Sequence, residues 1–298
     1  MKETTKSTYY ERIYTVLIYI QENLDEELSL DTLANLAHFS PTHFHRIFKG
    51  MMSETLSEHI RRIRLERAAI RLALNSSSVT TAAFDAGYTT VESFSRAFKK
   101  VFACAPSQYS EKHWNELYDK IPGAVHYLLN NARSTLTLNR KGEMKMEVSV
   151  KDILEMRVAY KRHTGPYAEC DEAWKVLCDW ADAKKIINAE TQFLGICHDD
   201  PQITPPEKIR YDACMTVDGS IDAEGEVGIQ TIPGGKYAIT LHKGPYENLE
   251  KTYAKLFGVW LPESGHQFRE QPSFEIYLNS PEHTKPEDLL TEIYLPIK

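Results

Sequence analysis

The chain has 298 residues, of which 42% are hydrophobic and 26% charged, with a formal net charge of −7. This length favours two domains, and the composition is ordinary for a globular protein with a buried core. No apolar run reaches the roughly 18 residues of a membrane-spanning helix, and the polar start Met1–Tyr10 lacks a secretion signal.

The five cysteines are scattered along the chain, and none stands in C-x-x-C spacing. An odd, scattered set indicates reduced thiols in a cytoplasmic protein, and it argues against a zinc site or a disulfide framework. We therefore expect neither a metal nor a cofactor.

The charge is unevenly divided. From Pro41 to Asn115 there are eleven Lys and Arg residues against six Asp and Glu, whereas from Ile121 to Lys298 there are twenty against twenty-seven. The basic segment is suited to contact with phosphates, and the acidic remainder suggests a different task.

The N-terminal segment predicts a first helix-turn-helix. Ser29 is a candidate N-cap for a short helix over residues 30–37, and Ser40 followed by Pro41 marks the start of another. That second helix has a polar and basic face opposite its apolar side, as a DNA-reading helix requires. The apolar positions at helical spacing are Ile13, Val16, Leu17, Ile20 and Leu24 in the first helix, and Phe44, Ile47 and Phe48 in the last.

The pattern then repeats about 50 residues later. A long helix from Glu54 to about Leu74 leads to a short helix over residues 79–86, and Gly87 permits the turn. Thr89–Glu92 is a candidate capping box for the next helix. That helix carries Phe94, Phe98 and Phe102 on one stripe.

Three stretches carry a family resemblance: Leu30–Lys49, Arg62–Ala68 and Ala86–Tyr109. They resemble the AraC/XylS family of transcription regulators. The resemblance implies a DNA-binding domain over residues 1–118 that reads about 20 bp of double-stranded DNA through two recognition helices. It also implies contact with RNA polymerase. Ser53 and Ala103 stand where the family usually has glycine, so we expect slightly altered turns.

Carried over position by position, the resemblance gives two sets of DNA-contacting residues. Arginine suits guanine and glutamate suits cytosine, whereas lysine more often contacts phosphate. The expected base contacts are Thr42, His45, Arg46, Glu92, Ser95 and Arg96, and the expected phosphate contacts are Lys49, Lys99 and Lys100. His43 is given no role.

Residues 119–145 are polar and mixed, and we interpret them as a linker. Beyond Met146 an internal repeat is visible, because His163-Thr-Gly-Pro-Tyr167 returns as His242-Lys-Gly-Pro-Tyr246. Each copy follows a strand and precedes a helix, with Trp174 matching Tyr253 and Phe193-Leu-Gly-Ile matching Phe274-Glu-Ile-Tyr. We therefore expect an α+β domain over residues 146–298 made of a duplicated strand–helix–strand–strand unit.

These residues resemble the GyrI-like effector-binding domain. The resemblance implies a small, lipophilic or cationic effector held by an acidic residue among aromatic rings. Because side chains alternate along a strand, Phe274, Ile276 and Leu278 should enter the core, and Glu275 and Tyr277 should share the other face. The expected ligand-binding residues are Glu275, Tyr277, Tyr160, Trp174, Tyr211 and Trp260.

Two other functions remain open at this stage. The C-terminal domain could hydrolyse reactive small molecules with Glu275 as a general base, although no nucleophile–base–orienter set is visible. It could instead bind a protein. We favour the interpretation that the protein is a non-enzymatic regulator with an all-α double helix-turn-helix domain and an α+β effector-binding domain.

Overall fold

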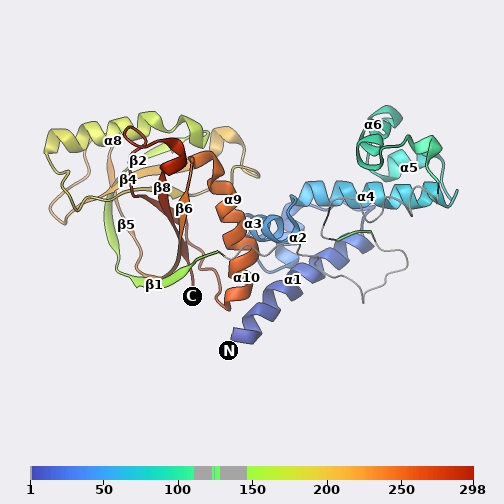
Figure 1. Cartoon of the computed structure of the whole chain (residues 1–298), viewed down its shortest axis with the longest axis horizontal. Helices are drawn as coiled ribbons and strands as arrows, with labels where there is room; N and C mark the ends of the chain where they lie inside the picture. Colours follow the sequence, from blue (N-terminus) through green and yellow to red (C-terminus); the bar gives the residue numbers. More distant parts are fainter. Residues whose placement is uncertain (1, 111–122, 124, 128–145) are drawn as a thin grey trace. The chain divides into compact units, whose positions relative to one another are not determined.

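The computed structural model describes residues 2–110, 123, 125–127 and 146–298. The chain divides into two compact units, one of residues 7–143 and one of residues 144–298 together with 1–6 (Figure 1). Most of the expected linker over residues 119–145 lies outside the described residues. Within the described part, no helix combines the length and the apolar character needed to cross a membrane.

The first unit is helical, as the sequence predicts. Its elements are α1 (Lys2–Glu22), α2 (Leu30–Leu36), α3 (Pro41–Met52), α4 (Leu56–Ala73), α5 (Val79–Asp85), α6 (Val91–Phe102) and a short 3-10 turn at Pro106–Gln108. The pairs α2–α3 and α5–α6 are the two predicted helix-turn-helix motifs, and α4 connects them.

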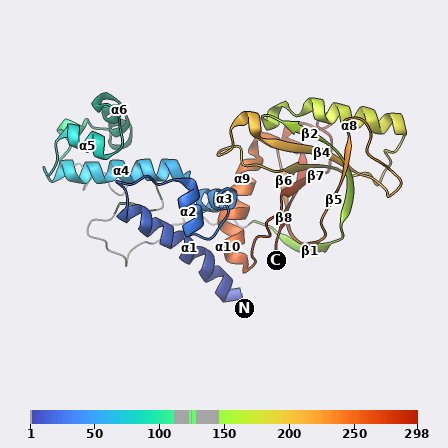
Figure 2. The same ribbon diagram turned by 180° about the vertical axis from the view of Figure 1, so that it is seen from behind.

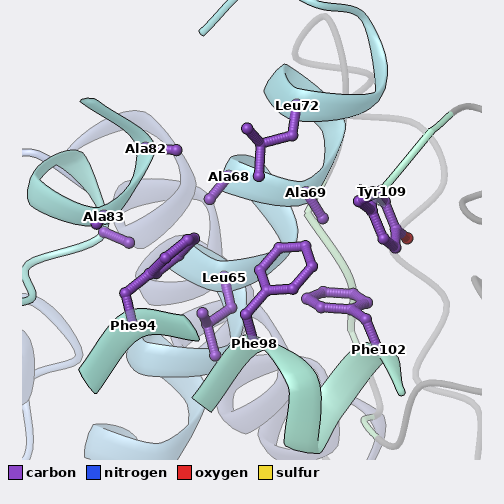
Figure 3. Packing of buried hydrophobic residues seen from close by; sticks show 11 residues of the cluster. Leu65, Ala68, Ala69, Leu72, Ala82, Ala83, Phe94, Phe98, Phe102 and Tyr109 are labelled. Atoms are coloured by element: carbon purple, nitrogen blue, oxygen red, sulfur yellow. The ribbon is translucent and has the colours of Figure 1, made fainter. Parts of the chain in front are cut away.

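The second motif is organised around an aromatic stripe. Phe94, Phe98 and Phe102 of α6 are fully buried and pack against Leu65, Ala68, Ala69 and Leu72 of α4 (Figure 3). Tyr109 closes this cluster with its ring edge-on to Phe98, at 5.1 Å between ring centres. The stripe lies at i, i+4 and i+8, so burial of one helix face fixes how α6 sits on α4.

The helix ends differ from expectation in two places. Thr90, not Thr89, is the N-cap of α6, and its side chain accepts from the Ser93 amide. Glu92 is therefore not part of a capping box, because the residue three positions after the N-cap is Ser93. A complete capping box instead opens α4, where the Thr55 and Glu58 side chains each bond the other's backbone amide.

Ser53 and Ala103 end α3 and α6 in the left-handed conformation, with φ of 59° and 55°. This is the conformation that glycine favours at a helix C-cap. The turns are therefore kept rather than altered, at some conformational cost to a residue with a Cβ.

The second unit is one antiparallel sheet of eight strands in the order β1-β6-β8-β7-β3-β4-β2-β5. The strands are β1 (Ser149–Ile153), β2 (Met156–Thr164), β3 (Phe193–Cys197), β4 (Arg210–Thr216), β5 (Gly228–Ile232), β6 (Gly235–Lys243), β7 (Ser273–Tyr277) and β8 (Leu290–Pro296). The helices are α8 (Asp171–Lys184), α9 (Leu249–Lys255), a π-helical turn at Leu256–Trp260, and α10 (Leu261–Ser264). Figure 2 shows helix α8 alongside β2 and β4.

The strand order confirms the duplication. It also shows that the two copies exchange their first strands, which the sequence did not reveal. Strands β2, β3 and β4 with α8 are repeated as β6, β7 and β8 with α9. Each copy also has a leading strand, and that strand pairs with the other copy: β1 with β6 and β5 with β2.

The pairing registers correct the repeat alignment by one residue. Cys197 faces Tyr211 in the first copy as Tyr277 faces Thr291 in the second. Cys197 is therefore equivalent to Tyr277, and Gly195 to Glu275. These last two residues also pair with each other across β3 and β7, so the pseudo-twofold axis passes between them.

Alternation gives the sheet two distinct faces. Phe274 and Ile276 pack on one face with Leu194 and Ile196, as expected. Leu278 does not enter the core, because it lies beyond the end of β7 and is 50% exposed. The opposite face, under α8, has a second cluster formed by Ala159, Leu177, Tyr211, Ala213 and Met215.

Candidate DNA interface and effector site

The two expected recognition helices are of equal length, but they expose their polar residues differently. On α6, Glu92, Arg96, Lys99 and Lys100 are exposed and Ser95 is partly exposed. On α3, Thr42, Arg46 and Lys49 are partly exposed, whereas His45 is only 3% exposed. A base contact by His45 would therefore require its side chain to become accessible.

His43 is a packed histidine. It is 7% exposed and lies edge-on to Phe39, at 4.9 Å between ring centres. Burial and the charges of Arg46 and Arg12 lower the pKa of His43 to about 3.

Most of the basic residues of α4 make hydrogen bonds within the helical unit. Arg62, Arg64, Arg67 and Arg71 all bond within the described part of this unit, whereas Arg61 is exposed. The positive charge that the sequence counts in this segment therefore overstates what is available to DNA phosphates.

Part of the expected linker is docked on α4. Glu66 is fully buried and accepts from the Tyr127 amide at 2.7 Å, from His126 Nδ1 at 3.0 Å and from Arg62 at 2.6 Å. Arg62 also donates to the Val125 carbonyl at 2.8 Å. These residues therefore belong structurally to the helical unit.

The centre of the candidate effector site is Glu275. This carboxylate is 4% exposed, and its two oxygens accept from neutral groups. The Tyr253 hydroxyl donates to Oε1 at 3.0 Å, the Tyr277 hydroxyl to Oε2 at 2.9 Å, and the Cys197 thiol to Oε1 at 3.6 Å. These donors hold the carboxylate in place.

Aromatic rings from both copies surround this carboxylate. The Tyr277 ring lies edge-on to Trp174 of α8 at 5.8 Å and edge-on to Tyr246 at 5.4 Å. The Tyr211 and Tyr277 hydroxyls are 2.9 Å apart. Burial, and then the charge of Glu275, raise the pKa of Tyr277, so its hydroxyl stays protonated and can donate.

Gly195 makes room for this arrangement. A Cβ on Gly195 would lie 2.4 Å from the Tyr211 hydroxyl oxygen and 2.5 Å from that of Tyr277. The missing side chain at Gly195 thus leaves room for Tyr277, which donates to Glu275, and for Tyr211, whose hydroxyl bonds that of Tyr277.

The structure groups four of the six residues expected to bind ligand: Glu275, Tyr277, Tyr211 and Trp174. Tyr160 does not join them, because it belongs to the cluster on the opposite face and its ring packs over Gly228. Trp260 follows α9 and stacks on His266, with ring centres 6.1 Å apart. Neither residue makes the contacts with Glu275 or Tyr277 that define the site.

The same opposite face contains a second buried carboxylate. Asp212 is fully buried and accepts from Arg162 Nε at 2.7 Å, from His198 at 2.8 Å and from Gln230 at 3.0 Å. Burial acts to raise its pKa, but these hydrogen bonds outweigh burial and lower the pKa of Asp212 below the usual range.

Sequence reasoning missed Tyr253, Cys197 and Tyr246 as members of the effector site. The repeat itself carried the signal, because Tyr253 matches Trp174 and Tyr246 matches Tyr167 of the same motif. A twofold arrangement brings equivalent positions to one axis from both sides. The histidines of the motif are structural: His163 and His242 each contact the carbonyl of the following proline through Nε2.

Comparison with known proteins agrees with this division. Residues 146–298 match the GyrI-like small molecule binding domain, and residues 33–112 match a helix-turn-helix domain family. The chain is 37% identical over 105 residues to the Transposon Tn10 TetD protein of Escherichia coli, covering 35% of this chain and 76% of TetD.

Two further relatives match parts of the chain. It is 33% identical over 100 residues to the regulatory protein SoxS of Salmonella typhimurium, covering 34% of this chain and 94% of SoxS. It is 29% identical over 140 residues to the DNA gyrase inhibitor of Escherichia coli strain K12, covering 45% of this chain and 87% of that protein.

A helix-turn-helix DNA-binding region followed by a small-molecule-binding domain defines a ligand-binding transcription regulator. The chain belongs to the GyrI-like small-molecule-binding family, joined in this case to an AraC-type helix-turn-helix domain. One relative that it matches, SoxS, is a regulatory protein.

Proposed function

We propose that the protein is a sequence-specific regulator whose C-terminal domain binds a lipophilic cation at Glu275. A buried carboxylate among aromatic rings suits such a ligand, because it combines charge pairing with cation–π contact. The observation that carries this proposal is the pair of tyrosine hydroxyls that hold the Glu275 carboxylate beside Trp174 and Tyr246.

A thermal-shift series on the full chain tests the ligand class. Tetraphenylphosphonium and tetraphenylborate have the same shape and opposite charge, so they separate the carboxylate's contribution from that of apolar contact. The cation at about a hundred times its Kd should stabilise the wild type by roughly 2.7 kcal/mol, and Glu275→Gln should remove most of this effect. Equal stabilisation by the borate would contradict a cation site.

The DNA half of the proposal rests on the polar faces of α3 and α6, which are partly exposed on α3 and mostly exposed on α6. Arg46→Ala and Arg96→Ala should each weaken binding to a selected duplex by about 1–3 kcal/mol and change base preference at separate positions. Arg61→Ala, an exposed arginine of α4, is the matched control. A uniform loss across all sequences would assign these residues to phosphate contact only.

Effector binding then alters DNA binding or the recruitment of RNA polymerase, and the protein acts in the cytoplasm where its DNA lies. The Cys197–Glu275 contact supports one alternative, hydrolysis of a reactive small molecule. Product formation from a bound electrophile that is lost in Glu275→Gln would favour that alternative. Retention of a partner protein in place of the cation would favour an interaction module.

A further inference from the structure

Arg64 of α4 reaches both helix-turn-helix motifs. Its Nε donates to the Leu24 carbonyl at 2.9 Å and its Nη2 to the Glu26 carbonyl at 3.0 Å, in the loop that leads into α2. A Cβ on Gly87 would lie 3.1 Å from Arg64 Nη1. The guanidinium therefore also lies against the turn between α5 and α6.

Arg67, one helical turn further along, makes the same connection through hydrogen bonds on both sides. Its two terminal nitrogens donate to the Asp25 carboxylate at 3.1 and 2.6 Å, and Nη2 also donates to the Asp85 carbonyl at 2.9 Å. Arg67 is only 5% exposed. Arg71 adds a contact with the Asp85 carboxylate at 2.8 Å.

These contacts link the loop that precedes the first motif directly to the turn of the second. A hydrophobic cluster also holds the second motif on α4, but apolar packing is non-directional and opposes sliding or rotation less strictly than hydrogen bonds do. A guanidinium presents its donors in a rigid planar fork, so it fixes orientation as well as distance.

We propose that Arg64 and Arg67 are positioning residues for DNA recognition, which set the separation and rotation of α3 and α6. They thereby determine which spacing between two half-sites the protein accepts, without contacting the DNA. The proposal rests on the proposed function, in which α3 and α6 each read a segment of the major groove.

The expected signature is a change in spacing preference rather than a loss of folding. The Asp25 side chain is 69% exposed, and an ion pair with so exposed a partner contributes little to stability. One base pair inserted between half-sites rotates them by about a tenth of a helical turn. A rigid protein should reject that rotation, and a loosened one should tolerate it.

The experiment uses the full chain and a duplex selected from a random pool by the wild type. Affinities are measured by fluorescence anisotropy for that duplex and for versions with one or two base pairs inserted or removed between half-sites. The variants are Arg67→Ala, Asp25→Ala and Arg64→Ala, with Arg61→Ala as the matched control.

The wild type and Arg61→Ala should lose at least about tenfold in affinity for each altered spacing. Arg67→Ala and Arg64→Ala should reduce that ratio to about threefold or less while base preferences within each half-site stay unchanged. Asp25→Ala, which keeps the Arg67–Asp85 contact, should give an intermediate ratio and remain folded even where Arg67→Ala does not. An unchanged ratio in Asp25→Ala and Arg64→Ala would overturn the proposal. Failure of the wild type to select any two-part site would instead refute the proposed function.

Discussion

Both units of the chain are built from two copies of a motif, and the copies have diverged in opposite ways. In the helical unit the framework is kept: Phe44 and Phe94 occupy equivalent buried positions, and Ser53 and Ala103 end their helices in the same left-handed conformation. In the sheet unit the copies differ most where they meet, with Gly195 facing Glu275.

This difference follows from where each unit does its work. Under the proposed function, α3 and α6 each read one segment of DNA, so each copy needs the same framework. A ligand on a pseudo-twofold axis meets both copies at once, and the axis has room for one carboxylate. Divergence there turns two similar halves into a single asymmetric site.

The largest expected effect is a difference in stability loss between substitutions at equivalent positions of the two sheet copies. Asp212 is fully buried with Arg162 and His198, whereas its equivalent Glu292 is partly exposed and accepts from the Tyr294 hydroxyl. Asp212→Asn should destabilise the protein by about 3 kcal/mol, at the low end for a broken buried pair because Arg162 can be rehydrated. Glu292→Gln should cost less than about 1 kcal/mol. Equal losses in urea unfolding would contradict the asymmetry.

Gly195→Ala tests whether the space beside the pseudo-twofold axis is too tightly packed to accept a Cβ. The added Cβ meets two tyrosine hydroxyls, so we expect a loss of about 2 kcal/mol in stability through overpacking, together with weaker binding of tetraphenylphosphonium. Gly219→Ala is the control, because nothing lies within 4 Å of its added Cβ. Thermal melts and titrations of both variants would decide the matter, and an unaffected Gly195→Ala would show that the axis is not crowded.

Lowering the pH should destabilise the first helical copy more than the second. His43, with a pKa of about 3, has Ser93 as its equivalent in the second copy. Because the folded pKa is depressed, stability is fully present above about pH 6.5 and falls as the pH drops from there toward 3. At pH 5.5 the loss should be on the order of 1 kcal/mol.

Hydrogen exchange followed by mass spectrometry gives the measurement for each helix. Peptides from α3 should exchange faster at pH 5.5 than at pH 7.5, after correction for intrinsic rates, and those from α6 should change less. His43→Leu should reduce the difference, and the remainder is expected from His59, which packs on Phe48 of α3 and whose pKa is also lowered by burial. The Asp212 carboxyl itself should stay ionised over this range, because its depressed pKa places its own loss of stability below about pH 4.

The smallest effect should be equal in both helical copies. Ser53→Gly and Ala103→Gly remove the strain of a left-handed C-cap, so each should stabilise the protein by up to about 1 kcal/mol. Ala97→Gly, inside α6, should instead destabilise it by about 1 kcal/mol. A gain in one copy only, seen as a shift in the thermal midpoint, would show that the two turns are not equivalent.

Much of the helical unit could be predicted from the sequence because its signals are local. The spacing of Phe94, Phe98 and Phe102 alone defines a buried helix face, and Ser40 before Pro41 marks a helix start. The N-cap of α6 was misplaced by one residue because Thr89 and Thr90 are chemically alike. The burial of His45 depends on neighbours distant in the chain.

The sheet unit was predicted less completely because register and face are set by pairing across the chain. Matching Phe193 with Phe274 put the repeat out by one position, and a shift of one residue exchanges the two faces of a strand. Tyr160 was expected among the ligand-binding residues but lies on the face opposite Glu275, and the apolar character of both faces gave no sign of this. Strand alternation predicted that Glu275 and Tyr277 share one face, and the structure brings Tyr211 and Trp174 to the same place.

Titration calorimetry of the full chain with tetraphenylphosphonium tests the central claim most directly. If one asymmetric site lies on the pseudo-twofold axis, the cation should bind with a stoichiometry of one. Its affinity should fall by at least about tenfold in Glu275→Gln and be unchanged in Glu292→Gln. Two equivalents bound per chain, or an affinity that does not depend on Glu275, would contradict the account.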